Sequence, residues 1–367
     1  MHSTSNHPLI LNLFLELAQI NGPSGQETDV AAFIKQYLGN LGLAVTEDEA
    51  HTKCDSAVGN LTCRVGTGGD TLLLAHMDTV RPTRDLQPVV LTDRITSSGD
   101  TILGADNRAG VAILLSTIRK AVENPEGYMD FSASFTICEE THLTGSKLLE
   151  VDPSIEMAYA FDSGYRPGHV IHGSYGAQSF AIEVQGRAAH AGLAPEKGIN
   201  AIWVAAQALA QLETGRLEDQ STLNFATIEG GSTTNVVPDS VLVKGETRAL
   251  TQERGKEIVQ RVFEIFDRVT KEHGAGLECS SKWEFTPFGI SEDSAIYIRV
   301  MRAMEQVGLT PKPLIAAGGS DANSLNDKGV PAINLGIGAQ NCHSNEEFIL
   351  IEDLLNAEKI AEALLRK

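Results

Sequence analysis

The stretch Thr71–Thr79 reads TLLLAHMDT. Leu72–Ala75 is an apolar run of the kind that forms a strand buried on both faces. The run ends in His76 and Asp78, two polar groups that a plain core strand does not carry. Side chains two residues apart in a strand point the same way, ~6.5 Å apart, so both lie on one side of the strand's end. In open α/β sheets, ligands bind at that carboxyl end.

The composition is that of an ordinary globular chain with a strong acidic bias. At 367 residues the chain is long for one hydrophobic core, so we expect two domains. A hydrophobic content of 42% and a charged content of 21% are typical of soluble globular proteins. The formal net charge of −19 argues against nucleic acid and against an anionic membrane surface as partners, because like charges repel.

The sequence also indicates a cytoplasmic location. No apolar run is long enough to span a bilayer, and Met1–Thr4 does not begin a secretory signal. The five cysteines are odd in number and widely spread, so they form neither a disulfide framework nor a metal-type pair. Free thiols in a reducing compartment fit this pattern best.

Helical and strand patterns alternate before residue 174, which indicates an α/β domain. Apolar spacing predicts helices over 6–20, from a capping box at Ser24–Glu27 to about Leu41, and over 108–122. Short strands are expected near 43–47, 60–66, 71–77, 131–137 and 157–161. The stretch 81–100 is expected to be irregular. After residue 286 the α/β pattern resumes.

The middle of the chain has a pattern of its own. Strands are expected at 176–185, 222–229, 240–249 and 276–285, with helices at 199–213 and 252–273. The order βαββαβ is that of a ferredoxin-like unit. We therefore expect a catalytic α/β domain with a mixed sheet, formed by residues 1–174 and 286–367, and an inserted ferredoxin-like domain at 175–285.

Polar residues gather at or after the ends of the predicted strands. They are His76, Asp78, Asp106, Glu139, Glu140, Asp162 and His343. Each has a plainer interpretation: Asp106 as a helix N-cap, Glu139 and Glu140 as a solvated turn, His343 as a surface histidine. A single metal site would explain all seven residues at once and is the simpler interpretation. Histidines and carboxylates without cysteine suit Zn²⁺, Co²⁺ or Mn²⁺. The number of acids suggests two ions that share a bridging carboxylate.

Several motifs give the chain a specific resemblance. They are Ala75–Thr79 (AHMDT), Gly104–Gly110 (GADNRAG), Glu139–Glu140, Phe161–Gly164 (FDSG), Gly318–Asp321 (GGSD) and His343. In this order and spacing they resemble the dizinc aminoacylase and carboxypeptidase-type metallopeptidases, most closely the tripeptidase branch. The inserted domain also falls where that family has its lid. One departure is Asn107, because the branch usually has a second Asp at that position.

The resemblance implies a role for each of these residues. His76 and Asp162 would bind one zinc ion, and Glu140 and His343 would bind the other. Asp106 would bridge the two ions, in a peptide bond to Asn107 that is typically cis in the family. Asp78 would orient His76, and Glu139 would be the general base. Glu139 is free for that task, since it cannot readily ligate the ion that its neighbour Glu140 binds.

The resemblance implies substrate contacts as well. His190 would reach over the active site and stabilise the oxyanion, Asn235 lies in a substrate-contacting loop, and Arg248 would meet the substrate carboxylate. Gly318 and Gly319 would line the substrate site. The plainer alternatives are a surface His190 and a structural Arg248.

The function we expect is zinc-dependent hydrolysis of short peptides, with removal of the N-terminal residue from tripeptides as the first choice. The alternatives within the family are a carboxypeptidase, a dipeptidase or an N-acyl amino acid deacylase, and a substrate panel separates them. A catalytically silent binding protein on the same scaffold is the remote alternative, since it would be expected to have lost some of these residues. The expected partners are a small peptide and, through the lid, a second copy of the chain.

Overall fold

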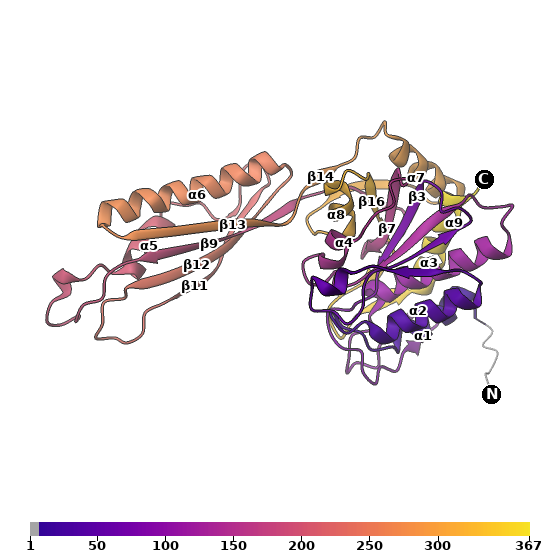
Figure 1. The fold of residues 1–367 in the computed structure, drawn as a ribbon, viewed down its shortest axis with the longest axis horizontal. Coiled ribbons are helices and arrows are strands. Elements are labelled where there is room, and N and C mark those ends of the chain that lie inside the picture. Colours follow the sequence, from indigo (N-terminus) through magenta and orange to yellow (C-terminus); the bar gives the residue numbers. More distant parts are fainter. Residues whose placement is uncertain (1–6) are drawn as a thin grey trace. The chain divides into compact units, whose positions relative to one another are not determined.

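Figure 1 shows the fold in a computed structural model, which describes residues 7–367. The expected helix start at Asn6 and the segment Met1–Thr4 lie outside the described residues. The chain divides into two compact units. The larger unit runs up to Gly173 and resumes at Gly289–Lys367, and the smaller unit is Ser174–Phe288.

The larger unit is built on one mixed sheet with the strand order β1-β2-β6-β3-β7-β16-β8-β14, and β15 pairs with β8. Its strands are β1 (Val45–Glu47), β2 (Leu61–Val65), β3 (Thr71–His76), β6 (Phe131–Thr136), β7 (Met157–Ser163), β8 (His169–Ser174), β14 (Phe288–Gly289), β15 (Lys312–Ala316) and β16 (Ala332–Gly336). β3 lies between β6 and β7 and is parallel to both, whereas β2 is antiparallel to β6. The carboxyl ends of β3, β6 and β7 therefore meet at one edge of the sheet.

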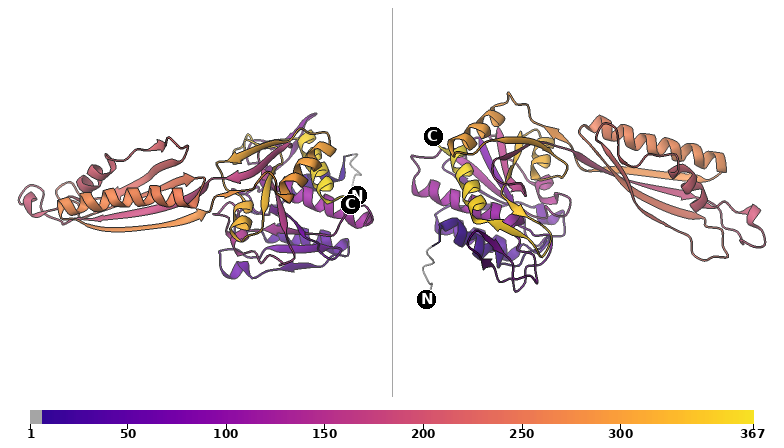
Figure 2. Two further views of the ribbon diagram at one scale, coloured as in Figure 1. Left: turned by 90° about the horizontal axis from the view of Figure 1, so that it is seen from above. Right: turned by 180° about the vertical axis from the view of Figure 1, so that it is seen from behind.

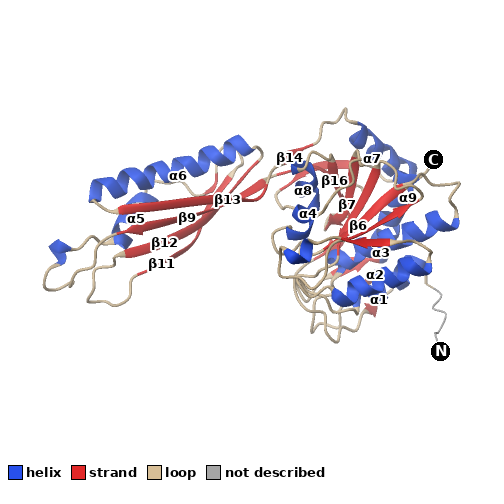
Figure 3. Cartoon of the chain, viewed as in Figure 1, coloured by secondary structure: helices blue, strands red, loops and turns tan. Residues whose placement is uncertain are grey.

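Helices cover both faces of this sheet (Figure 3). They are α1 (Leu9–Ala18), α2 (Thr28–Asn40), α3 (Ala105–Glu123), α4 (Thr144–Leu148), α7 (Ala295–Gln306), α8 (Asp321–Asp327) and α9 (Ile351–Leu365), with a 3₁₀ turn at Ala50–Thr52. α3 contacts β3, β7, α1 and α9, and because it is covered on all sides its Ala, Val, Ile and Leu side chains are almost all buried. α8 packs on β16, β7 and β3 and also contacts α4.

The start of α2 differs from the sequence expectation. The predicted capping box at Ser24–Glu27 does not form, because neither side chain caps the helix. Ser24 Oγ donates to Asp78 Oδ2 at 2.6 Å instead, and Glu27 is fully buried. Both side chains are therefore used in contacts with segments far along the chain.

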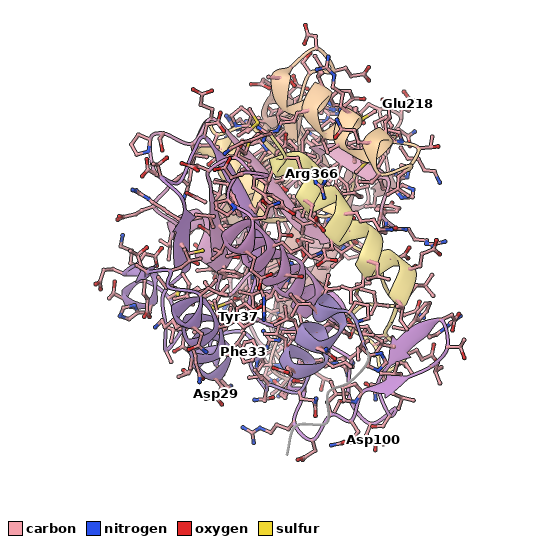
Figure 4. All side chains as sticks on the ribbon, turned by 90° about the vertical axis from the view of Figure 1, so that its right-hand side faces the viewer. Asp29, Phe33, Tyr37, Asp100, Glu218 and Arg366 are labelled. Carbon is pink, nitrogen blue, oxygen red and sulfur yellow. The ribbon has the colours of Figure 1, made fainter. Side chains whose placement is uncertain are left out.

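α2 has one buried face and one more open face. Val30, Ile34 and Leu38 are buried in the core, as the apolar spacing predicts. Asp29, Phe33 and Tyr37 follow one another at intervals of four residues, and Figure 4 labels them along the helix. The rings of Phe33 and Tyr37 stack with centroids 6.3 Å apart.

The stretch 81–100 is less irregular than expected. It contains β4 (Val89–Val90) and β5 (Arg94–Thr96). These pair in a small sheet of order β17-β18-β5-β4 with β17 (Ala339–Gln340) and β18 (Phe348–Leu350). Such two- and three-residue strands carry no apolar alternation, so periodicity alone could not reveal them.

The smaller unit has the expected ferredoxin-like order. It contains β9 (Gly176–Gln185), a 3₁₀ turn (Pro195–Lys197), α5 (Ala201–Leu209), β10 (Gly215–Arg216), β11 (Thr222–Gly230), β12 (Ser240–Ala249), α6 (Gln252–His273) and β13 (Gly276–Phe285). Its antiparallel sheet has the order β10-β11-β12-β9-β13. α5 and α6 contact each other and pack on the same sheet (Figure 2). The amphipathic α6 places Ile258, Val262 and Phe266 in this unit's own core.

Membrane-spanning helices are absent from residues 7–367, because none of the helices there is both long enough and apolar enough to cross a bilayer.

Candidate active site

The polar residues singled out at strand ends meet at one edge of the larger unit's sheet. His76 is the last residue of β3, Asp162 lies near the end of β7, and Glu139 and Glu140 follow β6. His76 is in register with Thr136, the last residue of β6. Because these strands are parallel and adjacent, their carboxyl ends bring the side chains together.

His76 is the centre of a first cluster. Its Nε2 lies 3.2 Å from Asp106 Oδ1 and 3.1 Å from Asp162 Oδ1. Its Nδ1 lies 3.2 Å from Asp78 Oδ1, so Asp78 sets the orientation of the ring. Burial opposes a charged imidazole, but Asp162, Asp106 and Asp78 outweigh it and raise the pKa of His76 well above its usual value. The oxygens of Asp106 and Asp162 thus both face His76 Nε2, which can donate only one proton between them.

His343 and Glu140 form a second cluster on the other side of Asp106. His343 Nε2 lies 2.9 Å from Glu140 Oε1 and 3.5 Å from Asp106 Oδ2. The nearby carboxylates of Asp106 and Glu140 raise the pKa of His343 to about 10. Within each cluster, the candidate ligand atoms all lie within 4.8 Å of one another. Asp106 belongs to both, with one oxygen directed to each.

Asp106 is held at the start of α3 in a non-helical conformation, so the N-cap interpretation is wrong. The N-cap residue is Gly104, and Asp106 has φ −85° and ψ 99°. The peptide bond between Asp106 and Asn107 is cis. Burial opposes ionisation of Asp106, but His343 and His76 outweigh it and lower the pKa of its carboxyl.

The residues present fit a metal cofactor. Imidazole nitrogens and carboxylate oxygens are ligands of Zn²⁺, Co²⁺ and Mn²⁺. Glu140 Oε1 is buried yet makes no aligned hydrogen bond with any described residue, although His343 is close to it. A cation placed among these oxygens would satisfy that atom and would relieve the repulsion between the carboxylates.

Glu139 lies in the same site but in neither ligand cluster. Burial is the main cause that raises its pKa well above its usual value, and the charge of Asp162 adds to it. Burial likewise raises the pKa of Asp162 to about 7, although His76 opposes this. A carboxyl with a raised pKa close to candidate metal ligands is typical of proton-transfer groups.

Two buried glutamates that sequence reasoning missed support this site through the backbone. Glu27 accepts from the backbone N–H of Cys138 at 3.0 Å. Glu347 accepts from the N–H of Gly104 at 2.7 Å and of Asp106 at 3.0 Å. Burial raises the pKa of Glu347 to about 7. The only signal for Glu347 is its place four residues after His343, where its neighbour Glu346 is equally acidic but exposed.

A cavity of about 650 Å³ opens onto these residues. Its lining includes Asp106, Glu139, Glu140, Asp162, Gly318, Gly319 and His343. Tyr165 and Ile171 form an apolar part of the cavity wall. A Cβ on Gly318 would meet no atom within 4 Å, so the protein itself does not require glycine there. The cavity volume is in the range of small-ligand sites.

The substrate residues expected in the inserted domain all lie in the smaller unit. His190 and Asn235 are exposed and adjacent: Ala191 N–H donates to the Asn235 carbonyl at 2.9 Å, and His190 pairs with Val236. Arg248 is half-buried near the end of β12, with its Nε 2.7 Å from Glu246 Oε1. Arg248 is in register with Ala177, whereas Ser240 is in register with Gln185 near the His190 loop.

Arg248 and His190 therefore lie toward opposite ends of the smaller unit's sheet. The eight residue-to-residue steps from Ser240 to Arg248 span roughly 26 Å of strand. A fully extended tripeptide spans only roughly 10 Å. One copy of this unit does not bring both side chains to one small substrate.

Comparisons with known proteins agree with this picture. Residues 172–274 match the family model of the M20 peptidase dimerisation domain. Over 366 residues the chain is 31% identical to the uncharacterised protein YqjE of Bacillus subtilis strain 168, with 99% of both chains covered. It is also similar to the crystal structure of the aminopeptidase PepT from Bacillus cereus, with a TM-score of 0.90, 31% identity and 97% of both chains covered. A tripeptidase structure from Staphylococcus aureus gives the same values.

The similarity extends over nearly the whole chain and includes both units. It confirms the resemblance that the strand-end motifs carried, and it confirms the mixed α/β fold with its inserted ferredoxin-like unit. The chain therefore belongs to the M20 family of metallopeptidases.

Proposed function

We propose that this metallopeptidase removes the N-terminal residue from tripeptides and uses two zinc ions that share Asp106. The observation that carries the proposal is the position of this carboxylate, whose Oδ1 faces His76 and whose Oδ2 faces His343. His76 and Asp162 would hold one ion, and Glu140 and His343 the other. Zinc is proposed because imidazole and carboxylate ligands without thiolate are common in its catalytic sites, and Co²⁺ or Mn²⁺ would fit the same ligands.

Glu139 is the proposed general base. When bound, the metal ions would supply a water that ionises near neutral pH and would polarise the scissile carbonyl. Glu139 is buried beside the ligands, and its raised pKa suits a group that takes a proton and gives it up again. Its carboxylate would receive the proton of the attacking water and pass it to the leaving amine nitrogen.

Other side chains keep this arrangement in place. Asp78 orients His76 through Nδ1, and Glu347 fixes the backbone at Asp106. Such partners of ligands and bases commonly change metal affinity or activity by about 10- to 100-fold when they are removed. They explain why many buried polar groups gather at one edge of the sheet.

Short peptides are the substrate class that the site and its relatives support. The cavity of about 650 Å³ suits a small ligand, and the similar solved structures are an aminopeptidase and a tripeptidase. A carboxypeptidase, a dipeptidase and an N-acyl amino acid deacylase are the alternatives that the same ligands would serve. A cytoplasmic location and the absence of nucleic-acid and membrane partners stay predictions.

We further propose that the working form is a homodimer formed through the smaller unit. His190 and Arg248 lie toward opposite ends of one sheet, so two copies would be needed to place both on one short substrate. In the smaller unit, Trp203 on α5 is 59% exposed and Ile228 on β11 is 53% exposed. β10 covers only the start of β11, so the rest of that strand is an open edge. The match to a peptidase dimerisation domain includes both elements.

The first test is cleavage of a tripeptide panel by chelated enzyme refilled with Zn²⁺, Co²⁺ or Mn²⁺. The expected result is release of the N-terminal residue from free-amine tripeptides, identified by mass, and no cleavage without metal. N-acetylated tripeptides and dipeptides serve as controls. Cleavage of N-acyl substrates alone would replace the aminopeptidase proposal by a deacylase, and metal uptake without any amide cleavage would contradict both.

The dimer has its own test. Light scattering of the wild-type protein should give twice the chain mass, and a Trp203→Glu and Ile228→Lys double variant should give the mass of one chain. A wild-type monomer with full activity would contradict the dimer while leaving the reaction untouched.

A further inference from the structure

Three consecutive backbone N–H groups after β6 donate to two buried carboxylates. Glu27 Oε1 accepts from Cys138 N–H at 3.0 Å. Asp78 Oδ1 accepts from Glu139 N–H at 3.0 Å, and Asp78 Oδ2 accepts from Glu140 N–H at 3.2 Å. Glu27 and Asp78 are both fully buried. The segment Cys138–Glu140 is thus held through its backbone by two buried carboxyl groups.

Glu27 is itself fully engaged with protein groups. Its Oε1 also accepts from Gly25 N–H at 2.9 Å and from the Cys138 thiol at 3.4 Å. Its Oε2 accepts from Ser56 Oγ at 3.0 Å. Glu27 does not line the cavity beside the metal-binding residues. It therefore does not act on substrate directly, and its contacts with Cys138 are what link it directly to the turn that carries Glu139.

The backbone of Cys138 needs this support. Its φ is +49°, in the left-handed region that a residue with a side chain rarely adopts. The hydrogen bond from its N–H to the buried Glu27 oxygen, at 3.0 Å, can stabilise this conformation. The turn directs the Glu140 side chain toward His343, so that Glu140 Oε1 lies 2.9 Å from His343 Nε2. Glu139, on the same turn, lies outside the ligand clusters.

A buried cation accompanies the two carboxylates. Arg108 is fully buried and donates to the carbonyls of Ile20 and Gly22 at 3.4 and 3.2 Å. Burial lowers the pKa of Arg108 to about 10, while the charges of Asp78 and Glu27 act to raise it. Its positive charge interacts with both Asp78 and Glu27, which favours the burial of these two acidic side chains.

We propose that Glu27 is a positioning residue for the general base Glu139, acting through the Cys138 N–H and the left-handed turn that follows it. The inference rests on the proposed function, because it takes Glu139 as the base. Loss of the Glu27 acceptor lets the turn relax and displaces the Glu139 carboxylate. Four of the five proposed metal ligands come from other elements, and the fifth, Glu140, is anchored by its contact with His343 at 2.9 Å, so both ions are retained.

The experiment compares Glu27→Ala, Glu27→Gln and Glu27→Asp in the zinc-loaded full chain with a tripeptide substrate. Glu27→Ala should lower kcat by about 10- to 100-fold, the usual range for such supporting residues, with KM within about twofold and both ions retained. Glu27→Gln should stay within about fivefold of wild type, because its amide oxygen can accept from Gly25 and Cys138 while its NH₂ donates to Ser56.

Glu27→Asp keeps the charge but is one methylene shorter. It should lose more activity than Glu27→Gln, because the shorter side chain no longer reaches the Cys138 N–H. The matched control is Ser56→Ala, which removes one hydrogen bond to Glu27 but leaves the Cys138 contact and should stay within about twofold. Thermal unfolding of each variant shows that the comparison is made on folded protein, and the Asp and Gln variants serve if the Ala variant does not fold.

A double-mutant cycle separates positioning from general stabilisation. In a Glu139→Gln background the base is absent, so adding Glu27→Ala should lower the residual rate by less than about twofold. An equal loss in both backgrounds, loss of the ions, a kcat for Glu27→Gln as low as for Glu27→Ala, or full activity of Glu27→Ala would each overturn the inference. Failure of the wild-type enzyme to cleave any tripeptide would instead contradict the proposed function.

Discussion

The Oδ1 atom of Asp78 accepts the backbone N–H of Glu139 at 3.0 Å and lies 3.2 Å from His76 Nδ1. One carboxylate oxygen therefore couples the orientation of a proposed metal ligand to the placement of the proposed base. Burial opposes ionisation of Asp78, but bonds from His76, Ser24 and Glu139 lower its pKa. Asp78 is charged at neutral pH and can accept on both oxygens.

Asp78→Asn should lower activity by about 10- to 100-fold and weaken metal binding. Both oxygens of Asp78 accept backbone N–H groups, so an amide NH₂ would face a donor in either rotamer. The measurement is kcat/KM with metal content by atomic spectroscopy. Ser24→Ala removes only one hydrogen bond to Asp78 and should lower kcat/KM much less than Asp78→Asn does. Equal activity of Asp78→Asn and wild type would refute the coupling.

Glu139→Gln should keep both metal ions and lower kcat by at least about 10². The amide has nearly the shape of the carboxylate but cannot take a proton, and Glu139 lies outside both ligand clusters. Turnover and metal content are measured on the same sample. Loss of an ion would mean that Glu139 is a ligand and not the base.

Asp106→Ala should remove both metal ions, because each cluster contains one oxygen of this carboxylate. Metal content after gel filtration decides the point. The control is Asp29→Ala, which removes an exposed acid on the outer side of α2 and should leave metal content unchanged (Figure 4). Retention of two ions by Asp106→Ala would remove its bridging role.

Arg248→Ala should mainly raise KM for peptides with a free carboxylate, since a guanidinium suits bidentate binding of a carboxylate. The KM for C-terminally amidated peptides should rise much less. Arg254→Ala, at a partly exposed arginine on α6 that pairs with Asp219, is the control in the same unit. The same loss on free and amidated peptides would show that Arg248 is structural.

Metal affinity should fall as the pH is lowered. Without metal, the nearby carboxylates of Asp106 and Glu140 raise the pKa of His343 to about 10, so the ring is protonated at neutral pH. A ligand nitrogen must lose that proton, so protons compete with the metal at every pH below about 10. Competition with a chelator at pH 6, 7 and 8 should show tighter binding at each step upward, with proton release on binding. A pH-independent affinity would exclude His343 as a ligand.

The sequence predicted that the strand-end residues would lie close together, because their signal is local. An apolar run that ends in His76 and Asp78, or in Glu139 and Glu140, can be recognised within ten residues. Parallel neighbouring strands then bring such ends to one edge of a sheet. The βαββαβ pattern of the smaller unit is equally local, with α5 ending a few residues earlier than the periodicity suggested.

The supporting residues could not be predicted in this way. Ser24 and Glu27 have the spacing of a capping box, yet they contact Asp78 and Cys138 instead. Glu346 and Glu347 are identical in type and adjacent, but only Glu347 is buried against the backbone of Asp106. Whether such a side chain bonds to its sequence neighbours or to a distant segment depends on which polar groups the folded core places beside it.

By itself, therefore, the sequence determined the two units, the family and the residues of the proposed metal site, since strand periodicity and chemically unusual strand ends are written into short segments. Only the tertiary structure decided that Asp106 presents one oxygen to each histidine, and that Glu27 and Asp78 hold three successive N–H groups of the turn carrying the base. The physical reason is that a buried carboxylate must find donors wherever the fold supplies them, and Glu27 and Cys138 are 111 residues apart in the chain.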